Sequence, residues 1–133
     1  MKKIINVVFP ELDDKNVRIE LDDVLSPKTF KAIINNLPVE VSINKWGEEI
    51  YTDRTQIIVE QEDNAKTEVN EFDVAYWPEG NALCLFYGPT PISKNGKILA
   101  YSPVNIVGRI IDPSNKVDIL NLIKERAKVI IRA

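Results

Sequence analysis

The stretch FDVAYWPEGNALCLFYGPTP, residues 72–91, decides the fold. Its central run, ALCLFY (82–87), is apolar on both faces, which is typical of a central strand covered on both sides. A proline-containing turn flanks the run at each end, WPEG before it and GPTP after it. Strand alternation predicts that Phe86 and Tyr87 point to opposite faces, one into the core and the other toward a groove. Cys84 shares the face of Phe86, and with no evident partner base we expect a buried apolar residue rather than a nucleophile.

On both sides of this stretch the chain alternates apolar and polar residues with a period of two, which predicts short β-strands. The alternation is clearest in VEVSINKW (39–46). Asn95-Gly96 is the residue pair that type I′ hairpin turns prefer, and residues 13–14 are expected to form a turn. Residues 62–71 are polar and acidic, which indicates an exposed loop or an edge turn. The remaining strands are expected at 3–9, 16–21, 48–53, 55–61, 102–112 and 128–133.

Two segments have helical periodicity instead. In the first, Phe30, Ile33, Ile34 and Leu37 fall on one stripe of a helix that begins after Ser26 and ends before Pro38. Ser26 is the predicted N-cap, because its side-chain oxygen can accept hydrogen bonds from the first turn, and Pro27 suits the first helical position. The second helix is expected at about 116–126, and its inward residues would be Val117, Ile119, Leu120, Leu122 and Ile123.

These elements predict a mainly β protein. The two helices are separated by most of the strands, whereas an α/β sheet would alternate helices with strands. Eight short strands suit a closed barrel whose open ends the helices cover. The chain has 133 residues, which fits one domain spanning residues 1–133.

Composition excludes several classes of function. The formal net charge is −3 and the lysines and arginines are scattered, which argues against a nucleic-acid surface and a polybasic membrane anchor. No apolar run approaches the roughly 18 residues of a membrane span, so we expect a cytoplasmic protein. The single cysteine excludes an internal disulfide.

The chain contains no histidine. This removes Ser-His-Asp and Cys-His catalysis in their usual forms, together with histidine-based metal sites. The glycine patterns of nucleotide-binding loops do not occur either. We therefore expect no metal and no cofactor.

Three segments carry a family resemblance: WGEEIY (46–51), DVAYWPEGNALCLFYGPTP (73–91) and SPVNIVGRI (102–110). Together they resemble a small prokaryotic group of cyclophilin-like proteins, found in bacteria and archaea and largely without assigned function. The resemblance runs over nearly the whole chain, from the first hairpin to the last strand. It implies the cyclophilin barrel, in which eight antiparallel strands close on themselves and two helices cap the ends.

The resemblance to peptidyl-prolyl cis-trans isomerases of the cyclophilin type is narrower. PKTFKAII resembles their first-helix segment and NIVGRIID one of their strands. Their F-H-R-I-I-P segment, which carries the essential arginine, is missing, and so are their Q-F-F-I motif and active-site histidine; Phe86 is the nearest equivalent by strand order. Isomerisation needs a donor to the proline nitrogen while the amide twists, and Arg54 or Arg109 would have to supply it.

The candidate ligand-binding residues come mainly from the segments that carry the resemblance, with the catalytic residues unknown: Trp46, Glu48, Tyr51, Tyr76, Trp77, Phe86 and Arg109. Trp46 and Tyr51 either form a groove wall or close a barrel end over a tight turn. Tyr76 and Trp77 form either a stacking platform or the closure of the barrel mouth. Glu48 and Glu49 are adjacent on a predicted strand, so they face opposite ways and do not pair directly.

Three functions fit these residues. The first is a binding module whose groove holds a small apolar ligand or an extended proline-containing peptide. The alternative is a divergent peptidyl-prolyl isomerase that uses the same groove. The third is a barrel kept for assembly into an oligomer, with the loops of Trp77 and Pro89 as the interface.

Overall fold

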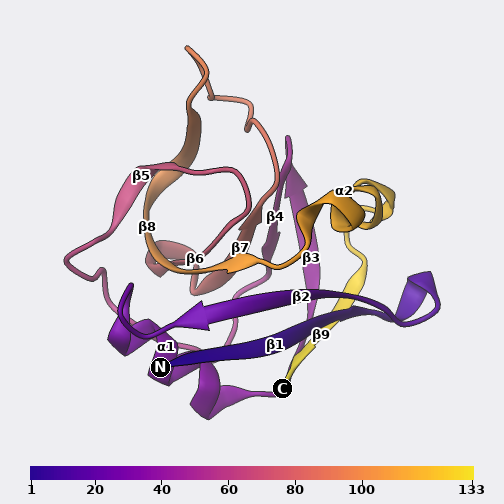
Figure 1. Ribbon diagram of the computed structural model, residues 1–133, viewed down its shortest axis with the longest axis horizontal. Helices are drawn as coiled ribbons and strands as arrows, with labels where there is room; N and C mark the ends of the chain where they lie inside the picture. Colours follow the sequence, from indigo (N-terminus) through magenta and orange to yellow (C-terminus); the bar gives the residue numbers. More distant parts are fainter.

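The computed structural model describes residues 1–112 and 118–133 in full, and residues 113–117 only as part of a helix (Figure 1). Two α-helices and two short 3₁₀ turns accompany the strands of the described chain: α1 (Pro27–Asn36), α2 (Pro113–Leu122), η1 (Pro10–Leu12) and η2 (Pro78–Gly80). The strands are β1 (Lys2–Phe9), β2 (Lys15–Asp22), β3 (Val39–Trp46), β4 (Glu49–Thr52), β5 (Lys66–Val69), β6 (Asp73–Trp77), β7 (Ala82–Phe86), β8 (Ile98–Ile110) and β9 (Lys128–Arg132).

Eight of these strands form a closed antiparallel barrel in the order β2-β1-β9-β3-β4-β7-β6-β8, and pairing of β2 with β8 closes the ring. At this seam Leu21 pairs with Gly108. A Cβ atom on Gly108 would lie 2.1 Å from the backbone carbonyl oxygen of Glu20, so the seam requires glycine. β5 pairs with β8 outside the ring. The predicted closed eight-stranded barrel with two helices is confirmed.

The barrel interior is filled by the apolar residues that alternate along its strands. In β7, Leu83 and Leu85 point into this core. α1 contributes Phe30 and Ile33, and the segment from α2 onward contributes the buried Leu120 and Ile123. In Figure 1 the two helices lie on opposite sides of the hairpin formed by β1 and β2.

A second, smaller apolar cluster lies on the outer face of β6 and β7. It consists of Val69, Ala75, Cys84, Phe86, Ala100, Val104 and Ile106. β7 is therefore buried along its whole length, with one set of side chains in the barrel and the other set in this outer cluster. The prediction of a central strand covered on both faces is confirmed, and so is the burial of Cys84.

The prediction of a strand at 55–61 is wrong, because this segment has no regular secondary structure. Its backbone is bound by side chains instead of a neighbouring strand. The Tyr76 hydroxyl donates to the Ile57 carbonyl at 2.5 Å and accepts from the Val59 N–H at 3.3 Å. The Asn105 side-chain amide donates to the Glu60 carbonyl at 3.0 Å. Apolar alternation in the sequence does not show that these side chains supply the partners.

The strand that completes the set of eight, in place of residues 55–61, is β6, whose segment we did not predict to be a strand. The polar segment 62–71, expected to be a loop or edge turn, contains the four-residue edge strand β5. Both expected turns are confirmed: residues 13–14 have positive φ, and so do Asn95 and Gly96, as a type I′ turn requires.

Ser26 occupies the N-cap position of α1, as predicted, but its side chain accepts no hydrogen bond from the first turn and its hydroxyl donates instead to the carbonyl of Ile106 at 2.5 Å. The side-chain cap comes from a distant residue. The Glu62 carboxylate accepts from the backbone N–H groups of Lys28 and Thr29 at 3.1 and 2.8 Å. A negative charge at this helix end also complements the helix dipole.

The second helix begins and ends earlier than predicted, and Leu122, expected to point inward, is 60% exposed. Val117 lies outside the residues whose side chains are described. No helix in the described part of the chain is both long and apolar enough to cross a membrane.

Candidate functional site

A cavity of about 370 Å³ lies on the outer face of the barrel, where β3, β4, β7 and β6 run side by side. Strand register explains which side chains reach it. Trp46 pairs with Glu49, and Tyr51 pairs with Cys84, so these four project to the same face. The cavity is lined by Trp46, Glu49, Tyr51, Trp77, Cys84, Ala100, Tyr101 and Val104.

Four aromatic side chains form a continuous series around this cavity. Trp46 and Tyr101 meet edge to face, as do Tyr101 and Trp77, and Trp77 and Tyr51; each pair has ring centroids 6.1 Å apart. The planes of neighbouring rings meet at 76°, 80° and 83°, so the rings form adjoining walls of the cavity. The Trp77 Nε1–H donates to the Ser102 hydroxyl at 2.6 Å, which fixes the indole.

Among these apolar walls lies one carboxyl group, that of Glu49. The residue is only 6% exposed. Loss of hydration raises the pKa of Glu49 from 4.5 to about 7, although a hydrogen bond with the Cys84 side chain partly opposes the shift. Burial, followed by the neighbouring Glu49 charge, raises the pKa of the Cys84 thiol well above 9.0. The thiol is therefore protonated at neutral pH and is not an activated nucleophile.

The electrostatic surroundings of Tyr51 are acidic. Burial contributes most to the raised pKa of its hydroxyl, and the charges of Glu125, Glu49, Cys84 and Asp53 raise it further. Among the described residues, no lysine or arginine lines the cavity.

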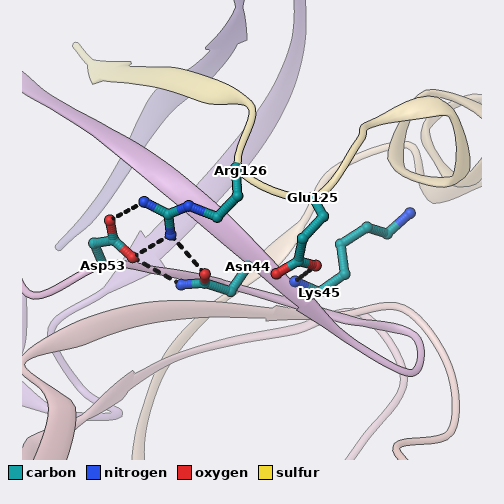
Figure 2. A network of polar contacts seen from close by, with 5 residues as sticks. All are labelled: Asn44, Lys45, Asp53, Glu125 and Arg126. Atoms are coloured by element: carbon teal, nitrogen blue, oxygen red, sulfur yellow. Dashed lines mark hydrogen bonds and ion pairs between the residues drawn. The ribbon is translucent and has the colours of Figure 1, made fainter.

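Two basic side chains of β3 and of the segment after α2 are held by groups outside the cavity, and Figure 2 shows the contacts of one of them, Arg126. Arg126 donates to both carboxylate oxygens of Asp53 at 2.7 Å and to the Asn44 side chain at 2.7 Å. The hydrogen bonds that Asp53 accepts from Arg126, and a further one that it accepts from the Asn44 side chain, lower the pKa of Asp53 to about 2. The Lys45 ammonium donates to the Leu120 and Ile123 carbonyls at the end of α2.

A family model described as Cyclophilin-like matches residues 3–132. The chain belongs to the cyclophilin-like family. Its fold resembles the solution structure of a hypothetical protein from Archaeoglobus fulgidus, with a TM-score of 0.79 and 36% sequence identity. The match covers 98% of this chain and 94% of the archaeal one. No curated protein matches the sequence. The family resemblance inferred from residues 46–51, 73–91 and 102–110 is thus confirmed.

In this cyclophilin-like chain, three of the predicted site residues meet at the cavity: Trp46, Tyr51 and Trp77. Tyr76 and Phe86 do not reach it. Tyr76 is fully buried in the barrel core and Phe86 is fully buried in the outer cluster. Adjacent residues on a strand face opposite ways, so Tyr76 and Trp77 separate into the core and the cavity.

Glu48 and Arg109 also lie away from the cavity. Glu48 is part of the turn between β3 and β4, where its side chain lies against Gly88; a Cβ on that glycine would be 2.6 Å from a Glu48 carboxylate oxygen. Arg109 lies on the β2–β8 seam with its side chain 69% exposed, and its Nε is 3.4 Å from the Glu20 carboxylate.

Glu49 and Tyr101 were missed as site residues. Strand parity was sufficient to find Glu49, because positions 49 and 51 share a face and Tyr51 was already a candidate. Tyr101 was missed because the last long strand was predicted to begin at 102, whereas β8 begins at Ile98.

Proposed function

We propose that this cyclophilin-like protein is a binding module that holds a small, largely apolar ligand in the aromatic cavity. The observation that carries the proposal is the convergence of four aromatic rings and one buried carboxyl group on a single cavity. Ligand sites typically combine apolar and aromatic walls with a few polar groups that orient the ligand.

The size of the cavity favours a small molecule over an extended peptide. Its volume of about 370 Å³ is near the lower end of the roughly 300–1,000 Å³ typical of ligand sites. A peptide would place one side chain in it and would need further contacts along the neighbouring strands.

Intrinsic fluorescence tests the proposal directly, because the chain has two tryptophans and both line the cavity. We expect aromatic and cycloalkyl fragments to change the emission of Trp46 and Trp77 in a saturable way. Amide chemical-shift mapping should place the largest changes at residues 46–51, 76–84 and 98–104. Saturable binding whose shifts lie only elsewhere on the barrel, or no binding across the fragment set, would contradict it.

An isomerase function is the second candidate, because the cavity is apolar and the barrel is cyclophilin-like. The polar side chains at the cavity include a carboxyl, a thiol and two phenols, and the described arginines lie outside it. We therefore expect a protease-coupled assay on a prolyl peptide to give the uncatalysed rate even at high protein concentration. A rate that rises in proportion to protein concentration would favour the isomerase instead.

A further inference from the structure

We propose that the ligand class of this cavity is an organic cation, with an alkylammonium group held against the aromatic walls and Glu49 as its counter-ion. The inference rests on the proposed function and specifies the chemistry of the ligand. It is carried by the position of a nine-tenths-buried carboxyl group inside an aromatic cavity.

A neutral ligand would leave Glu49 in an unfavourable position. Closing the cavity with an apolar molecule would remove the remaining water from this carboxyl, and an ionised carboxylate without a partner is costly to bury. A bound ammonium group compensates this cost, since opposite charges within a few ångströms favour the ionised form.

The described chain does not provide that positive charge itself. Arg126 is held by both oxygens of Asp53, and the Lys45 ammonium group is held by carbonyls at the end of α2. Lys97, which follows the hairpin turn before β8, forms an ion pair in which its ammonium nitrogen lies 3.7 Å from a carboxylate oxygen of Glu68. The cation at Glu49 would therefore come from the ligand.

The aromatic walls suit the same ligand. Trp and Tyr rings attract cations to their faces, and an ammonium group within about 6 Å of a ring centroid gains roughly 0.5–2 kcal/mol. Neighbouring rings here are nearly perpendicular, so we expect part of the cavity wall to be ring face. Alkylated ammonium groups fit such a wall better than a bare ammonium, because they carry apolar surface of their own.

The charged and titratable groups around Glu49 define how binding depends on pH. On β4 and β7, the pKa values of Tyr51 and Cys84 are raised, so both are neutral in this range. The pKa of Asp53 is about 2, so this residue is ionised throughout, and its charge is paired with Arg126. Glu125 adds negative charge near Tyr51, and the Tyr101 phenol is the one titratable group that β8 contributes to the described lining.

Glu49 must therefore be ionised to bind the cation, and its pKa in the free protein is about 7. Cation affinity should rise up to tenfold per pH unit as the pH approaches about 7 from below, and should level off above it. Binding near neutral pH should release protons. A neutral ligand of the same shape should show a flat or opposite pH dependence.

The test compares choline with 3,3-dimethylbutan-1-ol, its neutral carbon isostere, by tryptophan fluorescence and chemical-shift mapping on the whole protein. At about pH 8 we expect choline to bind at least tenfold more tightly than the neutral alcohol, measured as the ratio of the two dissociation constants. In E49Q this preference should fall to within about twofold, while the matched variant E48Q should keep it, because Glu48 lies outside the cavity.

Each outcome decides between the two proposals. Equal affinity for the pair, or a preference that E49Q retains, would overturn the cation inference and leave the binding function in place. Binding of neutral fragments without any binding of choline would do the same. If neither member of the pair nor any fragment binds at the cavity, both proposals fail.

Discussion

Glu49 and Asp53 lie four positions apart in the sequence, one at the start of β4 and the other just after its end, and they have opposite surroundings. Asp53 is half-exposed and binds Arg126 through both carboxylate oxygens (Figure 2), so its pKa is lowered to about 2. Glu49 is buried among aromatic rings, and its pKa is raised to about 7. The difference comes from the partners and the hydration that each position receives.

The comparison distinguishes a structural carboxylate from a candidate functional one. Asp53 links the end of β4 to the segment between α2 and β9, and its hydrogen bonds are satisfied within the chain. Glu49 has a hydrogen bond with the Cys84 side chain, and its burial opposes ionisation. Strongly perturbed pKa values in a cavity are typical of functional sites, because such positions are retained at a cost in stability.

The largest expected effect is a gain in stability when Glu49 loses its charge. An acid whose pKa is raised on folding destabilises the folded state as the pH rises from its unfolded value, here 4.5, through its folded value of about 7. The variant E49Q should therefore match the wild type near pH 4 and exceed it by about 3 kcal/mol at pH 8. Urea denaturation at both pH values measures this difference.

The variant E48Q serves as the control for removing a negative charge at the adjacent position. It should change the free energy of unfolding by less than about 0.5 kcal/mol, because glutamine keeps the shape of this partly exposed side chain against Gly88. If E49Q is equally or less stable than the wild type at pH 8, the carboxyl group has a partner that compensates its charge, and the contrast with Asp53 disappears.

A smaller effect of opposite sign is expected for D53N. The lowered pKa of Asp53 contributes stability above its unfolded value of 3.8, and this contribution is lost as the pH falls toward 2. Because the Asp53 and Arg126 side chains are 40% and 54% exposed, solvent screening limits the contribution to about 1 kcal/mol or less. D53N should thus be slightly less stable than the wild type at pH 7 and equal to it near pH 2. A loss that persists at pH 2 would show that the geometry of the aspartate, and not its charge, matters.

The same contrast explains what the sequence predicts and what it does not. Alternation and turn residues predicted the barrel, because buried strand faces impose a period of two and tight turns impose their own residues. The pattern failed at residues 55–61, where side chains from β6 and β8 bind the backbone in place of a strand partner. It placed the start of α1 correctly at Ser26 but missed the side chain that accepts the first-turn hydrogen bonds, which is Glu62 from a distant loop.

The sequence predicted part of the candidate site, namely the residues whose type and strand position point to it. Trp46, Tyr51 and Trp77 were identified from their type and position, and strand register brings them together. Glu48 was chosen as a candidate although strand parity places Glu49, and not Glu48, on the face of Tyr51. The pairing of Asp53 with Arg126, which follows α2, depends on the closed barrel and has no local pattern in the sequence.

We expect Y101A to have the smallest effect on stability and the most direct effect on the difference between the pKa values of Glu49 and Asp53. Tyr101 is 70% exposed and its ring meets Trp46 and Trp77 edge to face, so near pH 4, where Glu49 is protonated, its removal should change the free energy of unfolding by less than about 0.5 kcal/mol. It should also open the cavity to water and move the pKa of Glu49 from about 7 back toward 4.5, which carboxyl-detected NMR titration measures. Y101F retains the ring and should leave that pKa unchanged. If Y101A also leaves it unchanged, Tyr101 does not shield Glu49, and the desolvation comes from the remaining cavity walls and the outer cluster.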